Sequence, residues 1–381
     1  MPRNDLTSRI FKRAVVLGLG DELARRAGLR RERVEAIRRG DSYTADEYEQ
    51  LCRALAVDPS AMYRAEETRP ARSPARFRAA MGVRRPPGAD LRLLALAVEQ
   101  GRVLGHLMAL LDRPVELSGH RQVRAPRGKG PPWREGYDLG EAARARLHPE
   151  QGPLWDVEGL LRGLGVHVAR VPFSTPEIDA ASVWQPEAVP VILLNKRSRR
   201  YGNPGAVRAT LAHELCHLLH DAGEHDLTTQ VSWGGRRAGS FQDAVEVRAR
   251  AFAPAFLAPR GEVKAWFGGQ PRALNSDDRA KVESLARYWG LSFEGAVWHA
   301  KNCGVIEADV AEALAATPGP RRVDLEGFTV EAPSMRPADV HPDLPERAAD
   351  PWDGAAAEII LAALGEGHIT AGRARELLTW G

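Results

Sequence analysis

The 381-residue sequence predicts an α+β protein that is mostly helical, in which an all-α N-terminal bundle joins a larger domain with a small sheet. Three observations predict this class. Short helical patterns separated by glycines fill residues 8–63, short apolar strand-like runs lie between 166 and 195, and long helical patterns follow residue 203. Apolar residues make up 44% of the chain and charged residues 27%, a globular balance that excludes disorder throughout.

Residues 1–65 are expected to form the helical bundle. Gly28 and Gly40 each follow a helical pattern, at positions where a left-handed C′ residue fits best. Thr44 followed by Glu47 predicts a capping box for the next helix. The segment ELARRAGLRRERVEAIRRG resembles an XRE-type helix-turn-helix, with the turn at Gly28 and the recognition helix over residues 30–39.

This N-terminal module is also the basic part of the chain. Residues 1–40 carry 11 Lys+Arg against five acids, whereas the whole chain has a net charge of only +3. The surplus predicts contact with a polyanion, and a solvated helix face is the equally weighted alternative. If the polyanion is DNA, Arg30, Arg31 and Arg33 are candidates for base contacts, and Arg38 and Arg39 for phosphate contacts.

A single helix-turn-helix module buries little DNA surface, so a homodimer on a two-fold operator-like site is expected. Two rival roles for the bundle stay open, namely docking of a protein in general and recruitment of the substrate protein in particular.

Residues 66–136 are expected to be a linker and a connecting helix. Prolines and arginines fill the segment up to about residue 90, Asp90 is expected to cap a helix, and residues 113–136 read as a basic loop. No uninterrupted apolar run approaches the roughly 18 residues needed to cross a bilayer, and we expect no secretory signal. Three cysteines far apart in sequence predict a reducing, cytoplasmic setting without a membrane.

Residues 137–310 are expected to form the larger domain. Two successive helical patterns follow from Tyr137, the second of them in LWDVEGLLRGLG. Further helices are expected after Asn203-Pro204, near Ser240, and over 276–290 and 292–302. Strands are expected at 166–173, 181–184 and 189–195. In residues 311–381, seven prolines predict an extended tether over 317–352, and two short helices close the chain at 355–364 and 370–378.

The chemistry is concentrated in the HExxH motif His213-Glu214-Leu215-Cys216-His217. Two imidazoles one helical turn apart can reach the same metal ion, and Glu214 beside the first of them can take a proton from a water on that ion. A surface helix that happens to hold two histidines is the alternative. It is weakened because four of the chain's 11 histidines fall within 213–225.

A catalytic zinc site needs a third protein ligand and leaves the fourth position to water. Glu246, in FQDAVEVRARAFAPAFLAP, is the best candidate, because it would project from a second helix toward the first. The competitors are His220, Asp221, His225 and Asp226.

TLAHELCHLLH, followed by Glu246, Ala249, Phe252, Ala253 and Pro259, resembles the ImmA/IrrE family of zinc metallopeptidases over about residues 138–306. The resemblance implies a zincin-like peptidase domain, zinc as the cofactor, His213, His217 and Glu246 as its ligands, and Glu214 as the general base. It also implies a regulator protein as the substrate, such as a repressor or antitoxin. A strand within 180–194 is expected to hold that substrate in extended form by β-addition.

The sequence departs from the family pattern at two residues. Cys216 stands where Gly or Ala is usual, and is expected either to face the metal or to be a small packing residue. Pro254 is expected to interrupt the second helix. Tyr201 and His225 are the candidates for stabilising the oxyanion.

Together these patterns predict a DNA-binding regulator with zinc-dependent endopeptidase activity. The alternative is a transcription factor whose metal site is structural or sensory and performs no proteolysis.

Overall fold

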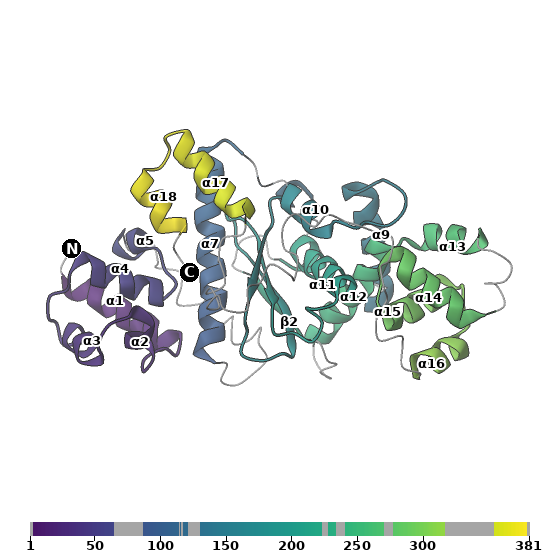
Figure 1. The fold of residues 1–381 in the computed structure, drawn as a ribbon, viewed down its shortest axis with the longest axis horizontal. Coiled ribbons are helices and arrows are strands. Elements are labelled where there is room, and N and C mark those ends of the chain that lie inside the picture. The colour runs from purple at the N-terminus through teal and green to yellow at the C-terminus, as the bar shows by residue number, and fades with distance from the viewer. Residues whose placement is uncertain are drawn as a thin grey trace, which may run out of the picture.

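The structure is a computed structural model that describes residues 3–64, 87–113, 115, 117–120, 130–222, 228–233, 241–269, 277–316 and 354–378. The described part is mostly helical with one small mixed sheet, which confirms the predicted α+β class. The N-terminal bundle lies at one end of an elongated molecule, the sheet and a long helix lie in the middle, and a second group of helices forms the other end (Figure 1). The predicted tether over 317–352 and most of the predicted linker lie outside the described residues.

The N-terminal bundle contains five short helices. Gly28, at φ +66°, ends the second of them in the left-handed conformation, and Gly40 also has a positive φ of +109°. The capping box of Thr44 and Glu47 is present. The helices are α1 (Arg3–Val16), α2 (Leu23–Ala27), α3 (Arg31–Arg38), α4 (Ala45–Ala54) and α5 (Pro59–Arg64).

The long helix α7 (Gly88–Leu110) stands between the N-terminal bundle and the sheet (Figure 1). It begins before Asp90, so Asp90 is not its cap; its carboxylate instead accepts a hydrogen bond of 2.8 Å from the backbone N–H of Ser174. Among the described helices, α7 alone is long and apolar enough by length and composition to span a membrane, but 67% of that stretch is buried inside the protein.

The sheet separates two hydrophobic clusters. Its order is β1-β3-β2-β4, with β1 parallel to β3 and the other neighbours antiparallel. Along the central strand β3, Val191 and Leu193 pack on the side of α7, whereas Ile192 and Leu194 pack on the side of the second helical group. The strands are β1 (His167–Val171), β2 (Ile178–Trp184), β3 (Val191–Asn195) and β4 (Thr228–Trp233), of which β4 was not among the expected strands.

The second helical group carries the HExxH motif. Its helix after Asn203-Pro204 and the helix beginning near Ser240 are confirmed, and the latter continues through Pro254 to Leu257. The elements are α8 (Leu117–His120), α9 (Pro132–Leu147), α10 (Val157–Gly163), α11 (Pro204–Cys216), the π-helical turn η3 (His217–Asp221), α12 (Phe241–Leu257), α13 (Arg260–Gly268), α14 (Asp278–Trp289), α15 (Phe293–Cys303) and α16 (Ala308–Ala316).

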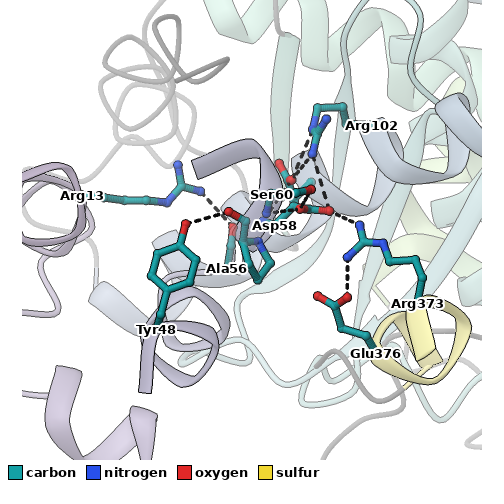
Figure 2. A network of polar contacts seen from close by, with 10 residues as sticks. Arg13, Tyr48, Ala56, Asp58, Ser60, Arg102, Arg373 and Glu376 are labelled. Carbon is teal, nitrogen blue, oxygen red and sulfur yellow. Dashed lines mark hydrogen bonds and ion pairs between the residues drawn. The ribbon is translucent and has the colours of Figure 1, made fainter. Parts of the chain in front are cut away.

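Of the two C-terminal helices, α17 (Gly354–Gly365) packs against α7, and α18 (Ala371–Leu378) packs against α17 (Figure 1). Asp58, only 3% exposed, joins them to the N-terminal bundle: its carboxylate forms an ion pair with Arg373, lies 4.0 Å from Arg102 and accepts hydrogen bonds from Ser60 (Figure 2). One hydrophobic cluster includes residues of the N-terminal bundle, α7, one sheet face and α17–α18.

Candidate metal centre

Helix α11 presents the HExxH motif inside the protein. It begins where expected, because the side chain of Asn203 accepts a hydrogen bond of 3.1 Å from the backbone N–H of Ala206 and Pro204 occupies the first turn. Its last turn is buried: His213 is 8% exposed, His217 1% and Glu214 0%. The motif is therefore not on a solvated surface helix.

The chain then widens into the π-helical turn η3. Its backbone is marked by the hydrogen bond of 3.0 Å from the N–H of Ala222 to the carbonyl of His217. The turn places Asp221 beside His217, with 2.8 Å between Oδ2 and Nδ1. Because a carboxylate accepts, Nδ1–H is the donor, and in the neutral ring Nε2 of His217 then carries the lone pair that a metal needs.

Three ligand atoms converge at this point. Nε2 of His213 and Nε2 of His217 lie 3.1 Å apart; Nε2 of His213 lies 3.3 Å from Oε2 of Glu246 on α12, and Nε2 of His217 lies 3.3 Å from Oε1 of the same carboxylate. One ligand atom from each of the three residues lies within 4.8 Å of the others. Zinc bonds of about 2.0–2.1 Å in tetrahedral geometry place ligand atoms about 3.3 Å apart. The separations between these three side chains therefore fit one zinc ion.

The electrostatics of the centre also favour a cation. Burial would lower the pKa of His217, but the carboxylates of Asp221 and Glu246 raise it to about 10. Burial would raise the pKa of Glu246, but the imidazoles of His213 and His217 bring it well below its usual range. Oε2 of Glu246 is buried and accepts no hydrogen bond within the described part of the chain. A metal ion would bind that oxygen, and it would supply the positive charge that the carboxylates of Asp221 and Glu246 stabilise.

The side chain of Glu214 is hydrogen-bonded to a residue of the sheet. Ser232 on β4 donates a hydrogen bond to its Oε1, while Oε2 is buried and accepts no hydrogen bond from a described residue. One oxygen of the carboxylate is thus fixed and the other is left available for a proton, which is what a general base requires.

The order of the strands contradicts the prediction that a strand within 180–194 holds the substrate. Both strands within 180–194 are interior: β3 pairs with β1 and β2, and β2 pairs with β3 and β4. Interior strands have no free edge for β-addition. Within the described sheet the edges are β1 and β4, and β4 is the edge that contacts Glu214 through Ser232.

The remaining candidates of this region have other surroundings or lie outside the described residues. His220 is buried edge-on against the ring of Phe252, with 5.9 Å between ring centroids. Cys216 is fully buried in the apolar core and is not among the side chains that could hold a metal, and burial raises the pKa of its thiol. Tyr201 is half-buried against the same core. His225 and Asp226 lie outside the described residues.

The comparisons with known proteins bear on the same region. Residues 161–297 match the model of the IrrE N-terminal-like domain, peptidase family M78. The match includes His213, Glu214, His217 and Glu246, and it indicates a metallopeptidase domain of the ImmA/IrrE type. Neither the curated proteins nor the solved structures gave a match. The M78-like domain thus covers the sheet and helices α11–α14, and the N-terminal bundle lies outside it.

The five arginines proposed for DNA contact differ in their surroundings. Arg30, Arg31, Arg38 and Arg39 are exposed on and around α3. Arg33 is instead half-buried, with its guanidinium 2.6 Å from Glu47 and 2.7 Å from the carbonyl of Ser42. The Arg33 guanidinium therefore links α3 to α4.

The sequence did not single out Ser232 or Arg248, and it offered Asp221 only as a competing metal ligand. In the structure Asp221 accepts a hydrogen bond from Nδ1 of His217; its spacing of four residues from His217 was the available signal. Ser232 and Arg248 approach the centre from β4 and α12. No local pattern marks them, because their positions depend on tertiary packing.

Proposed function

We propose that this chain is a zinc-dependent endopeptidase joined to a DNA-binding bundle, and that it regulates transcription by cleaving a repressor- or antitoxin-like partner protein. The observation that supports this best is the convergence of His213, His217 and Glu246 on one point, beside a buried Glu214 with one available oxygen. Three buried cysteines without a disulfide agree with a cytoplasmic setting.

The site residues have distinct roles. A zinc ion, when bound by His213, His217 and Glu246, would act as a Lewis acid and lower the pKa of a water molecule toward 7. Glu214 takes the proton of the attacking water and passes it to the leaving amine. The edge of β4 holds the substrate backbone in extended form, next to the Ser232 hydroxyl that orients Glu214.

The deciding experiment compares the wild-type protein with Glu214→Gln. Both proteins are loaded with zinc and incubated with the regulator encoded next to this chain. We expect cleavage by the wild type and none by the variant, with equal zinc content. Equal cleavage by both would refute the role of Glu214. No cleavage by either, combined with zinc-sensitive DNA binding, would favour the alternative of a transcription factor with a structural or sensory metal.

The DNA-binding part of the proposal depends on the exposed arginines around α3. Electrostatic binding to DNA weakens steeply with salt, so a shallow salt dependence would instead favour recruitment of the substrate protein by the bundle. A homodimer on a two-fold site is part of this proposal, and sedimentation with and without a duplex tests it.

A further inference from the structure

Arg248 lies at the junction of three elements around the metal centre. It follows Glu246 by two residues on α12, forms an ion pair with Oδ1 of Asp221 in η3, and lies 3.7 Å from Oε2 of Glu135 on α9. Its side chain is 13% exposed, that of Asp221 5% and that of Glu135 16%. Segments η3 and α12 already meet where His217 approaches Glu246. The contact between Asp221 and Arg248 joins the same two segments at a second point.

The two oxygens of Asp221 have different partners. Oδ2 accepts the hydrogen bond from Nδ1 of His217, and Oδ1 accepts from Arg248. A carboxylate fixed at both oxygens cannot rotate, so the imidazole that it holds keeps one orientation and one tautomer.

The backbone of α12 at Arg248 lies in close contact with helix α9. A Cβ on Gly136 of α9 would lie 2.2 Å from the carbonyl oxygen of Arg248, and one on Gly140 would lie 2.6 Å from that of Phe252. The glycines thus let α9 contact the backbone of α12, which sets the position of the helix that carries Glu246.

We propose that Arg248 is a positioning residue of the metal centre, which acts through Asp221 to hold Nε2 of His217 toward the ion. The inference rests on the metal site of the proposed function, and it adds a residue that contacts neither the ion nor the substrate. Since it acts through Asp221, its loss and the loss of Asp221 remove the same interaction.

The test is a double-mutant cycle in zinc affinity. Zinc dissociation constants are measured on the full-length protein by competition with a chromophoric chelator, for the wild type, Arg248→Gln, Asp221→Asn and the double variant. Loss of an outer-shell partner typically weakens metal binding about 10–100-fold. We expect a weakening of about tenfold for Arg248→Gln, and an affinity of the double variant equal to that of Asp221→Asn alone. Arg250→Gln, on the exposed face of the same helix, is the matched control and should bind zinc as the wild type does.

The outcomes separate this inference from the proposed function. If the wild type binds no zinc, the proposed function fails. If the wild type binds zinc and Arg248→Gln binds it equally well, or if the two single losses add in the double variant, only the role of Arg248 is overturned. Should Arg248→Gln fail to fold, Arg248→Met replaces it in the cycle; it keeps the unbranched side chain but neither the charge nor the donors, and an affinity equal to that of the wild type would likewise overturn the proposal.

Discussion

The hydroxyl of Ser232 on β4 donates a hydrogen bond to Oε1 of Glu214 on α11, and both side chains are buried. The contact ties the sheet edge proposed to hold the substrate to the proposed general base. Removing the hydroxyl with Ser232→Ala frees the Glu214 carboxylate to rotate. A hydrogen bond to a charged group contributes about 1.5 kcal/mol, which corresponds to roughly a tenfold change in rate. We therefore expect Ser232→Ala to lower kcat about tenfold and to leave the zinc affinity unchanged. Ser232→Thr keeps the hydroxyl and should restore the rate; equal rates for Ser232→Ala and the wild type would contradict the role.

The stability of the second helical group should depend on the protonation of His299 on α15. Its Nε2–H donates to the carbonyl of Ala258 at 2.7 Å, and Nδ1 accepts from the hydroxyl of Tyr137 at 2.9 Å. Burial lowers the pKa of His299 to about 4, below its usual 6.5, so the unfolded chain binds the proton first as the pH falls. Stability is therefore full above pH 6.5 and is lost between pH 6.5 and 4, by roughly 2–3 kcal/mol at pH 4.5.

The measurement for His299 is urea unfolding at pH 7.5 and 4.5, with His299→Gln as the comparison. Because other groups also titrate, the informative quantity is the difference between the two proteins. The wild type should lose more free energy of unfolding than His299→Gln over this pH range. Parallel losses would show that His299 does not carry the effect.

The ion pair between Arg373 and Asp58 should hold the C-terminal helices on the rest of the molecule. We expect Arg373→Ala to lower the free energy of unfolding by about 1–3 kcal/mol, because the buried Asp58 carboxylate loses a charged partner. Arg375→Ala, at an exposed position of the same helix, is the control. Thermal denaturation of the two variants checks this, and identical midpoints would mean that the Asp58 network does not stabilise the fold.

DNA binding should separate the exposed arginines from Arg33. If Arg31 and Arg39 contact DNA, then Arg31→Gln or Arg39→Gln weakens binding to a duplex, and loss of a phosphate contact lowers the slope of log affinity against log salt by about one. Arg33→Gln should instead lower thermal stability, because its guanidinium bonds to Glu47 and Ser42. Fluorescence anisotropy over a salt series measures the slopes. Unchanged affinity in both exposed variants would count against this face.

The predictions that the structure confirms are local ones. The left-handed Gly28, the capping box of Thr44 and Glu47, and the cap of Asn203 each depend on residues within a few positions of one another. A capping residue and its partner N–H are adjacent whatever the rest of the chain does, so short sequence patterns predict them.

The sequence by itself placed two imidazoles and Glu214 on one helix and named Glu246 as their partner, because helical spacing and a family resemblance carry that information. Tertiary structure alone decided which strands are the sheet edges, that the carboxylate of Asp221 accepts a hydrogen bond from His217, and that Arg33 bonds within the bundle. It also decided that the N-terminal helices share a core with α7, the sheet and the C-terminal helices. These relationships depend on how helices and strands that are distant in sequence pack together. A short window of sequence does not contain that information, so it could not predict them.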